Sequence, residues 1–457
     1  MKDEPTEMHK PIAIVSCSQA KVQSVLETSN VQHQPRKSEM SGRTSMNPRK
    51  IAFYGLFGMQ NWGNECTLQA VLYNVRRFLP SAELRCFCTD PDDTLRTHNI
   101  PAFPIASRYE KGYQRLGREK AHPLIRLFQK VFIQVPVELL SWARAFKCLR
   151  GFDMLVVPGT GLLTDFSTTW LGFPYHLLKW SIIAKLCRCE LIFVSVGAGP
   201  MYHPLTKWFI RAALSLATYR SYRDSYSKQF LESVGFRADS DCLYPDLAFS
   251  LPRALFPEYN RHDRQKTVVG VGMKDYYGKL GLPQKGGEAK YRDFINKLGA
   301  FVTWLLQNGY AVRFLIGDTL CDYKVKQDVI ELLRKRGIKS DDWDITAKSI
   351  SSVTELLSEL ASTDIVVSPR FHNILLALML GKPVASLSYH EKFSSLMAGF
   401  GLAAYCHDID DLDVDLLTKH VTQLEKSTDG LKPQIKQKVE EYRDALDEQY
   451  TRIFTLK

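Results

Sequence analysis

Residues 364–373 read Asp-Ile-Val-Val-Ser-Pro-Arg-Phe-His-Asn, and an apolar run follows them up to Leu380. The β-branched residues predict a short buried strand, and the apolar run predicts a helix over 373–380. Arg370 and His372 would then lie where the strand ends and the helix begins, which is where open α/β sheets bind their ligands. The N–H groups of a helix N-terminus favour an anion, and a guanidinium and an imidazole strengthen that preference. We therefore expect a site for a small polyanion that also undergoes proton transfer.

The same alternation of strand, turn and helix runs through the rest of the chain. Short apolar runs predict strands at 51–55, 84–88, 154–157, 191–196, 219–223, 267–272, 312–316 and 384–387. Helical stretches such as 67–78 separate them, and this alternation predicts parallel sheets with crossover helices. A segment rich in Pro, Arg and Asp at 252–266 interrupts the series. The sequence thus predicts two Rossmann-like α/β domains, 47–252 and 267–432, that face a cleft.

The two ends of the chain differ from this pattern. Residues 1–46 are rich in Ser, Gln, Lys and Glu and lack periodicity, so we expect them to be disordered. Residues 433–457 carry apolar side chains three or four positions apart, which gives one apolar stripe. We expect a closing helix that packs across the domains.

Composition indicates a globular, cytoplasmic protein of more than one domain. The 457 residues are 45% hydrophobic and 24% charged, with a formal net charge of +11. No run approaches the roughly 18 apolar residues of a membrane helix, and the apolar stretch 12–17 is shorter than a signal-peptide core. The ten cysteines are scattered, and no Cys/His set has the spacing of a zinc site. We therefore expect reduced thiols and no metal.

The segment 108–150 concentrates positive charge. It holds ten basic and three acidic residues, a charge of +7, interleaved with apolar and aromatic side chains. This composition is typical of a basic amphipathic helix pair on a membrane surface. It is equally typical of a helical insertion that packs on its own domain with a solvated basic face. The sequence leaves both open, and the first predicts peripheral contact at the inner face of the plasma membrane.

Several strand ends carry glycine or charged residues without a decisive motif of their own. Glycine-containing turns lie at 55–65, 158–161, 197–200 and 270–272. Neither the G-x-G-x-x-G spacing with an acidic partner nor a phosphate loop is present, so dinucleotide and P-loop chemistry are disfavoured. Arg223 lies at the end of a predicted strand, in a position like that of Arg370. Taken alone, it is most simply explained as a helix cap or as an ion-pair partner of Asp246. Asp165 and Asp246 are, singly, ordinary capping candidates.

Short motifs stand in a specific order along the chain. They are Asn61-x-Gly63-x-Glu65, Asp153, Pro158-Gly159-Thr160-Gly161-Leu162-Leu163-x-Asp165, Gly197-x-Gly199-Pro200, Arg223-Asp224-x-x-Ser227, Asp246, Arg370-x-His372 and Tyr389-x-x-Lys392. This order, over residues 51–402, resembles the polysaccharide pyruvyl transferase family. Asn64 stands where many members have Asp, and Thr160 where many have Gly, which leaves acceptor choice and turn geometry open.

The resemblance implies a GT-B-like fold and a reaction that uses phosphoenolpyruvate. Members of the family transfer its enolpyruvyl carbons to two hydroxyls of one sugar, which makes a pyruvate ketal and releases phosphate. By resemblance, the C-terminal domain takes the donor and the N-terminal domain the acceptor. Four residues would bind the donor: Arg223, Arg370, His372 and Lys392. Three are candidates on the acceptor side: Asn61, Glu65 and Asp165.

The chemistry of the donor agrees with this assignment. Phosphoenolpyruvate presents a carboxylate and a phosphate, so its site needs two separated cations, and arginine forks match both oxyanions. Arg223 and Arg370, one from each domain, would supply them, and Lys392 would hold the leaving phosphate. Ketal formation also needs proton transfer, for which His372 is the catalytic candidate because imidazole titrates near neutral pH. The alternative is that His372 only recognises the donor.

Two other functions fit the same fold. A nucleotide-sugar glycosyltransferase would share the cleft, but the C-terminal half lacks the glutamate pair of retaining GT-B enzymes. A non-catalytic carbohydrate-binding protein would not need the four donor residues together. The expected partners are phosphoenolpyruvate and a sugar or lipid-linked oligosaccharide of exopolysaccharide or cell-surface glycan biosynthesis. Neither a cofactor nor nucleic acid is expected.

Overall fold

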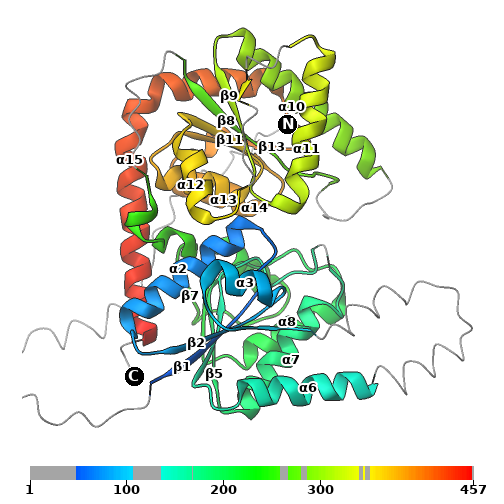
Figure 1. Cartoon of the computed structure of the whole chain (residues 1–457), viewed down its shortest axis with the longest axis vertical. Coiled ribbons are helices and arrows are strands. Elements are labelled where there is room, and N and C mark those ends of the chain that lie inside the picture. Colours follow the sequence, from blue (N-terminus) through cyan, green and yellow to red (C-terminus); the bar gives the residue numbers. More distant parts are fainter. Residues whose placement is uncertain are drawn as a thin grey trace, which may run out of the picture.

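The computed structural model describes residues 48–106, 135–166, 168–257, 266–278, 286–338, 343–344 and 350–454. They form two α/β domains, each built on one parallel sheet, which lie one above the other in Figure 1. The predicted fold class of two Rossmann-like domains is confirmed. The segment predicted to be disordered, 1–46, and the part 108–134 of the basic segment lie outside the described residues.

The N-terminal sheet is entirely parallel, with strand order β3-β2-β1-β4-β5-β6-β7. Its strands are β1 (Lys50–Tyr54), β2 (Glu83–Cys88), β3 (Ala102–Pro104), β4 (Met154–Pro158), β5 (Glu190–Val196), β6 (Tyr219–Tyr222) and β7 (Cys242–Leu243). Its helices are α2 (Trp62–Phe78), α3 (Pro91–His98), α6 (Val135–Leu149), α7 (Phe173–Leu186), α8 (Pro204–Ser215) and α9 (Ser225–Ser233). The strand order reverses between β1 and β4, which is the point where doubly wound sheets bind ligands.

The C-terminal sheet is also parallel, with strand order β10-β9-β8-β11-β12-β13. Its strands are β8 (Val268–Gly272), β9 (Ala311–Leu315), β10 (Trp343–Asp344), β11 (Ile365–Ser368), β12 (Val384–Ser388) and β13 (Cys406–Asp408). Its helices are α10 (Gly287–Gln307), α11 (Thr319–Lys335), α12 (Val353–Ala361), α13 (Phe371–Met379) and α14 (Glu391–Gly399). Here the order reverses between β8 and β11, next to Arg370 and His372.

The loops at the carboxyl ends of the two sheets meet. Asn61, before α2, forms an isolated bridge with Asp318, before α11. The Trp62 N–H donates to the Gly317 carbonyl at 3.1 Å, and Trp62 Nε1 donates to Thr319 Oγ1 at 2.9 Å. These contacts define the domain junction, where the strand ends of both sheets come together.

The helix α15 (Val414–Phe454) runs along both domains and is the long orange-to-red helix of Figure 1. Near its start Glu425 accepts hydrogen bonds from Thr267 Oγ1 at 2.6 Å and from the Tyr310 hydroxyl at 2.7 Å, both in the C-terminal domain. Near its end Gln449 Nε2 donates to Ser221 Oγ of the N-terminal domain at 2.6 Å. The closing helix therefore begins at Val414, before the predicted 433, and Pro433 lies inside it.

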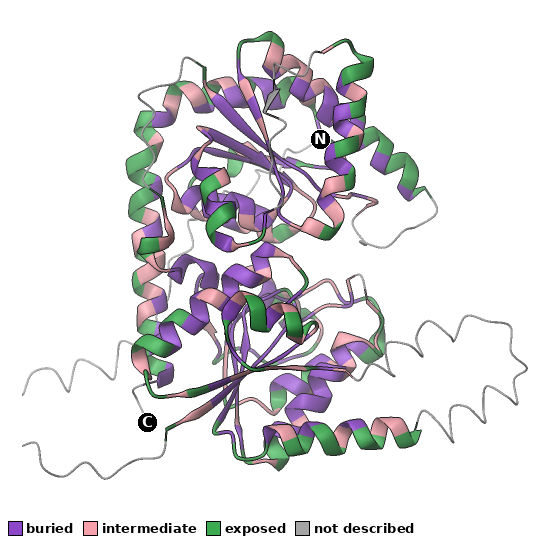
Figure 2. Ribbon diagram, viewed as in Figure 1, coloured by how far each residue is buried: buried purple, intermediate pink, exposed green. Residues whose placement is uncertain are grey.

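Buried residues connect the two domains, as the purple segments on both sides of the junction in Figure 2 illustrate. One cluster lies within the N-terminal domain around β4, β5 and α7. The other runs from α2 through the short 3₁₀ helix η3 (Leu247–Ser250) and α15 into the C-terminal sheet. Separating the domains would expose apolar surface from this shared core, which opposes separation. None of the helices in the described part of the chain combines the length and apolar character of a membrane span.

Candidate functional site

Arg223 directly follows β6 and lies at the domain junction, with 7% of its side chain exposed. Its Nη1 donates to Asp246 Oδ2 at 3.2 Å, and its Nε lies 3.4 Å from Asp224 Oδ2. Its guanidinium carbon is 5.1 Å from the centre of the Phe371 ring, which begins α13 in the other domain. The pairing with Asp246 that the sequence suggests is therefore present, and it holds the guanidinium against the C-terminal domain.

Asp246 connects Arg223 to His372. Its Oδ1 lies 3.8 Å from His372 Nε2 and accepts a hydrogen bond from the Ala248 N–H at 3.1 Å. Burial raises the pKa of Asp246, but His372, Arg223 and the Ala248 N–H lower it by more, so the carboxylate stays ionised. A buried carboxylate beside an imidazole orients the ring and stabilises its protonated form. The sequence predicts a capping role for Asp246 and a pairing with Arg223, and the structure adds its position beside His372.

Two glycines of the motifs make room for these side chains. A Cβ at Gly63 would lie 2.1 Å from His372 Nδ1, and a Cβ at Gly197 would lie 2.6 Å from Arg223 Nη2. Side chains at either position would collide with the ring or the guanidinium. Gly63 and Gly197 therefore serve the site by their small size.

Arg370 lies beside His372 in sequence but faces acidic side chains of its own domain. Its Nε donates to Asp322 Oδ2 at 3.1 Å, and its Nη2 pairs with Asp322 Oδ1. Asp318 and Asp275 lie 3.6 Å and 3.5 Å from the guanidinium. Burial lowers the pKa of Arg370, but Asp322 and then Asp318 raise it by more. The guanidinium is therefore charged and already paired, and its role in donor binding stays a prediction.

Lys392 lies in an aromatic setting at the same junction. Its Nζ is 5.5 Å from the centre of the Phe371 ring and 5.4 Å from that of Tyr389. Burial lowers the pKa of Lys392, Tyr389 opposes that shift, and the positive charges of Arg223 and Lys274 add to it. Lys274 is buried and its Nζ lies 4.7 Å from the Tyr389 ring centre.

Sequence reasoning missed Lys274 as a site residue. The signal that could have found it is its place two residues after β8, since the carboxyl ends of parallel strands share one edge of the sheet.

Of the three acceptor-side candidates, Asn61 alone lies at the junction between the domains. Its Nδ2 donates to Asp318 Oδ2 at 3.2 Å. Glu65 is buried inside the N-terminal domain, where Oε1 accepts from the Gly58 N–H at 3.0 Å and Oε2 lies 2.8 Å from His98 Nε2. Asp165 accepts from the backbone N–H groups of residues 202 and 203 at 2.9–3.0 Å. Glu65 and Asp165 thus hold loops that lead to the junction.

The arrangement supplies charge and proton-transfer groups rather than metal ligands. Among the residues that the structure describes, no group of three or more His, Cys, Asp or Glu could hold a metal ion. The cations Arg223, Lys392 and Lys274 lie around the rings of Phe371 and Tyr389, with His372 beside them. Such a set can bind an anion and exchange protons with it.

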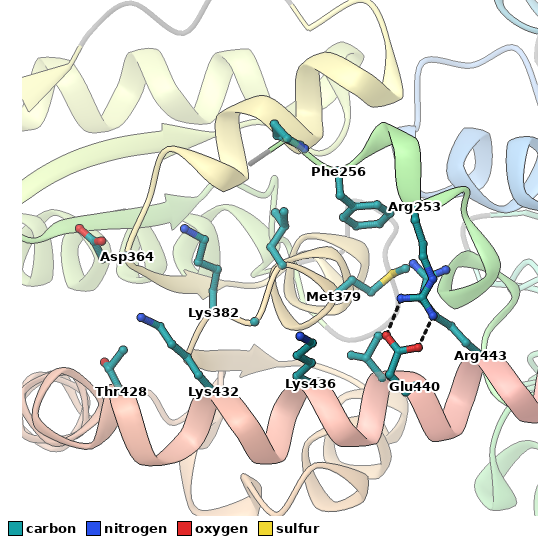
Figure 3. Close-up of a pocket in the computed structure, with 14 residues that line it drawn as sticks. Arg253, Phe256, Asp364, Met379, Lys382, Thr428, Lys432, Lys436, Glu440 and Arg443 are labelled. Atoms are coloured by element: carbon teal, nitrogen blue, oxygen red, sulfur yellow. Dashed lines mark hydrogen bonds and ion pairs between the residues drawn. The ribbon is translucent and has the colours of Figure 1, made fainter. Parts of the chain in front are cut away.

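A separate groove lies where α15 passes the end of α13 and the 3₁₀ helix η4 (Arg253–Leu255), as Figure 3 shows. Basic side chains of α15 face Lys382 across it, and Glu440 of α15 pairs with Arg253. None of the residues predicted to bind donor or acceptor lines this groove. Asp364 and Lys382, which come before β11 and β12, place it at the amino ends of these strands, whereas Arg370 and His372 follow the carboxyl end of β11.

Solved structures with the same architecture act on or bind uridine nucleotides. Anabaena Alr3699/HepE in complex with UDP-glucose has a TM-score of 0.55 and 13% identity, over 88% of this chain and 98% of that one. The UDP-GlcNAc 2-epimerase from Methanocaldococcus jannaschii has a TM-score of 0.53 and 10% identity, over 82% and 92%. The S. aureus MnaA–UDP structure has a TM-score of 0.54 and 13% identity, over 89% and 96%. At these identities the likeness shows the fold alone.

The sequence comparisons identify the family. No curated protein matches the chain. The family model described as polysaccharide pyruvyl transferase matches residues 61–391, which include Arg223, Arg370 and His372, predicted to bind the donor, and stop one residue short of Lys392. Since the match covers most of the chain, from the loop before α2 to the start of α14, this protein belongs to the polysaccharide pyruvyl transferase family.

Proposed function

We propose that this protein transfers the pyruvyl group of phosphoenolpyruvate to two hydroxyls of one sugar, forming a pyruvate ketal and releasing phosphate. The observation that carries the proposal is the convergence of Arg223 and Asp246 from one domain with His372 and Lys392 from the other. Membership of the family supports the reaction class. The acceptor belongs to an exopolysaccharide or a cell-surface glycan.

The proton transfers fit the groups at the junction. A sugar hydroxyl must lose its proton as its oxygen attacks C2 of the donor, and a base is needed beside it. His372 is that base in our proposal, because Asp246 lies 3.8 Å from Nε2 and stabilises the imidazolium that forms. Arg223 holds one oxyanion of the donor, and Lys392 holds the phosphate that leaves.

The first experiment establishes the reaction. The purified full chain is incubated with phosphoenolpyruvate and a panel of sugar acceptors, and phosphate release and acceptor mass are followed. A gain of one pyruvyl group as ketal, with one phosphate released, is the expected result. Transfer of sugar from a nucleotide sugar, with no use of phosphoenolpyruvate, would instead support a glycosyltransferase and contradict the proposal.

A second experiment assigns the role of His372. His372→Gln keeps a polar side chain but removes the titrating group, and should lower kcat by about 10²-fold or more while donor affinity is largely kept. His420→Gln, in α15 and away from the junction, is the control. Loss of donor affinity with an unchanged kcat would assign His372 to recognition only.

We also propose that the α6 surface contacts an anionic membrane that carries a lipid-linked acceptor. Val135, Leu139 and Phe146 lie on one helix face and are 52%, 65% and 36% exposed. Lys147 and Arg150, also exposed, flank this face with positive charge. An exposed apolar stripe beside basic residues is typical of helices that lie in the membrane interface.

Vesicle sedimentation tests this contact. The full chain should sediment with vesicles that contain anionic lipid, and Leu139→Glu should reduce the bound fraction. Leu95→Glu, an exposed leucine on α3, is the matched control. Absence of binding to anionic vesicles at low salt would remove the membrane contact and leave the pyruvyl transfer untouched.

A further inference from the structure

Two lysines at the domain junction, Lys274 buried and Lys392 half-buried, lack an acidic partner among the described residues. Lys274 is 8% exposed, and among the described residues the contacts of both lysines are with aromatic rings rather than with a carboxylate at ion-pair distance. Both ammonium groups instead lie over the Tyr389 ring, at 4.7 Å and 5.4 Å from its centre. Burying two like charges together is costly unless a negative charge balances them.

The other cations at the junction differ in this respect. Arg370 pairs with Asp322, Asp318 and Asp275, and Arg223 pairs with Asp246 and Asp224. These arginines therefore carry their own counter-charges within the protein. The uncompensated charge lies on Lys274 and Lys392, so an anionic ligand gains most by binding next to them.

The position of the lysines connects them to the proposed reaction centre. Phe371 lies between the groups, since Lys392 Nζ and the Arg223 guanidinium carbon are 5.5 Å and 5.1 Å from its ring centre. His372 is the next residue, with a ring centre 5.3 Å from that of Phe371. An anion beside Lys274 and Lys392 would thus lie near both Arg223 and His372.

Tyr389 is an ionisable group that both lysines approach. The charged and titratable groups around it come from several elements: Lys274 and Tyr276 after β8, Arg370 before α13, and Lys392 in α14. Burial raises the pKa of Tyr389, but Lys274, Lys392 and Arg370 lower it by more, to about 7. A phenol that titrates near neutral pH can both give and take a proton during turnover.

We propose that Lys274 and Lys392 bind the phosphate of the donor, and that Tyr389 between them is a catalytic residue that protonates the donor's methylene carbon. The inference rests on the proposed function, for which it names the acid. The Tyr389 O–H bond breaks as a C–H bond forms at the methylene carbon, and the remaining tyrosinate balances the two lysines. His372 meanwhile takes the proton of the first sugar hydroxyl as its oxygen bonds to C2.

The second half of the reaction restores the tyrosine. The second sugar hydroxyl attacks C2, and the C–O bond to phosphate breaks with its electron pair on the leaving oxygen. The proton of that hydroxyl goes to the Tyr389 tyrosinate, and His372 gives its proton to the released phosphate. Acid and base are thereby separate residues, Tyr389 and His372.

Donor binding tests the lysine pair without turnover. Isothermal titration with phosphoenolpyruvate, and with inorganic phosphate as a second probe, should show an affinity at least about tenfold weaker in Lys274→Met. Lys274→Arg keeps the charge and should retain more affinity than Lys274→Met. Lys436→Met, on the far groove of α15, is the matched control. Wild-type affinity in a folded Lys274→Met variant would overturn the binding role.

The ultraviolet absorption of tyrosinate tests Tyr389 without any substrate. The wild-type protein should form one tyrosinate at about pH 7, and Tyr389→Phe, which keeps the ring, should lose it. Tyr405→Phe, in the 3₁₀ helix η6 (Ala403–Tyr405), should keep it. Lys274→Met should move the titration to higher pH because a positive charge is removed. Identical titrations of the wild type and Tyr389→Phe would overturn the inference.

Turnover separates this inference from the proposed function. Tyr389→Phe should lower kcat by about 10²-fold or more with little change in the KM for phosphoenolpyruvate. A wild-type protein that transfers pyruvate, with full kcat in Tyr389→Phe, overturns the acid role alone. A wild-type protein that transfers none overturns the proposed function, while phosphate binding and the tyrosinate titration still support the site.

Discussion

Two glycines let the backbone come close to functional side chains of the site, Gly63 across the domain junction and Gly197 within the N-terminal domain. Gly63 of α2 lies against His372, and Gly197 after β5 lies against Arg223, so in each case a backbone of one strand–helix turn contacts a side chain that the mechanism uses. Close packing of this kind fixes the position of an imidazole or a guanidinium more firmly than a hydrogen bond alone. Residues that have no functional group therefore help to fix the distances between the base, the cation and the donor.

Gly63→Ala should abolish most activity although it adds one methyl group. The new Cβ would lie 2.1 Å from His372 Nδ1, so either the ring or the start of α2 must move. Since a displacement of about 1 Å can cost about 10²-fold in rate, kcat should fall by at least that factor. Gly161→Ala is the control, because nothing lies within 4 Å of a Cβ there. Steady-state kinetics on both variants checks this, and equal kcat values would contradict it.

Arg370→Met should mainly lower the stability of the fold, and any effect on catalysis should be secondary. Asp322 is fully buried, and Arg370 is the cation that compensates its charge. Removal of one partner of a buried pair costs about 3–5 kcal/mol, so the free energy of unfolding should drop by that order. Adding Asp322→Asn should recover much of the loss, as denaturant unfolding can measure. If Arg370 also binds the donor, the double variant will fold but show a raised KM for phosphoenolpyruvate.

At this scale the sequence identifies residues but not their partners. Arg223, His372 and Lys392 follow from strand ends and motif order, and the structure brings them together. The three carboxylates around Arg370 belong to residues 275, 318 and 322, which lie far from it in sequence. No local pattern therefore indicates that the guanidinium is already paired. The sequence does not indicate a role for Lys274 either, because an isolated lysine after a strand has no motif around it.

Central and edge strands differ in how well the sequence reveals them. Every strand predicted from an apolar run is present, whereas β3, β7, β10 and β13 were not predicted. These four are the outer strands of the two sheets. An outer strand has one neighbour and needs few residues, so it lacks the continuous apolar run that burial on both faces imposes on a central strand. The early start of α15 was missed because Pro433 is typical of a first helical turn.

The start of α14 contains a pH-sensitive link between the domains. His390 Nδ1 accepts from the Lys392 N–H at 3.1 Å as the helix cap, and Nε2 lies 3.1 Å from the Gly199 carbonyl of the N-terminal domain. The neutral ring, with its proton on Nε2, satisfies both contacts. Burial, followed by the charge of Lys392, lowers the pKa of His390 to about 4.

This link predicts that stability falls below neutral pH. The unfolded histidine titrates near 6.5 and the folded one near 4, so unfolding takes up a proton between these values. Stability is therefore full above pH 6.5 and decreases as the pH falls toward 4, by up to about 1.4 kcal/mol per pH unit for one histidine.

Denaturant unfolding across this range, with His390→Asn beside the wild type, measures the slope. Asparagine keeps a capping acceptor but does not titrate. The slope of the unfolding free energy against pH should therefore be smaller in the variant by the contribution of about one proton. The pKa values of His176 and His407 are also lowered to about 4 by burial, so these two residues should still contribute to the slope that remains in the variant. A variant with the same slope as the wild type would contradict the assignment to His390.

Two of the contacts that hold the domains together have different properties. On one side α15 crosses both domains, and its buried Gln449 and Tyr450 bind Ser221 and Ser250 of the N-terminal domain. On the other side the loop 60–62 meets the loop 317–319 through a few hydrogen bonds. The first contact is apolar and extensive and the second is polar and small. The domains therefore should hinge about α15 and adjust their approach at the site.

Asn61→Ala should loosen the polar contact and weaken donor binding without a change of fold. The side chain of Asn61 donates to Asp318 Oδ2 at 3.2 Å, while the neighbouring backbone hydrogen bonds remain. Arg223 and Lys392 come from opposite domains, so a wider junction separates the groups that bind the donor. A hydrogen bond to a charged group contributes about 1.5–3 kcal/mol, which predicts a KM for phosphoenolpyruvate raised by about tenfold or more.

Small-angle X-ray scattering and kinetics together distinguish this effect from a direct contact with substrate. Asn61→Ala should increase the radius of gyration of the free protein, and saturating phosphoenolpyruvate should reverse the increase, because donor binding draws the domains together again. Asn308→Ala, at the exposed end of α10, is the control and should change neither quantity. A raised KM with an unchanged radius of gyration would place Asn61 in contact with a substrate instead. In that case the acceptor-side role predicted from the sequence, rather than domain approach, would explain why an asparagine precedes α2.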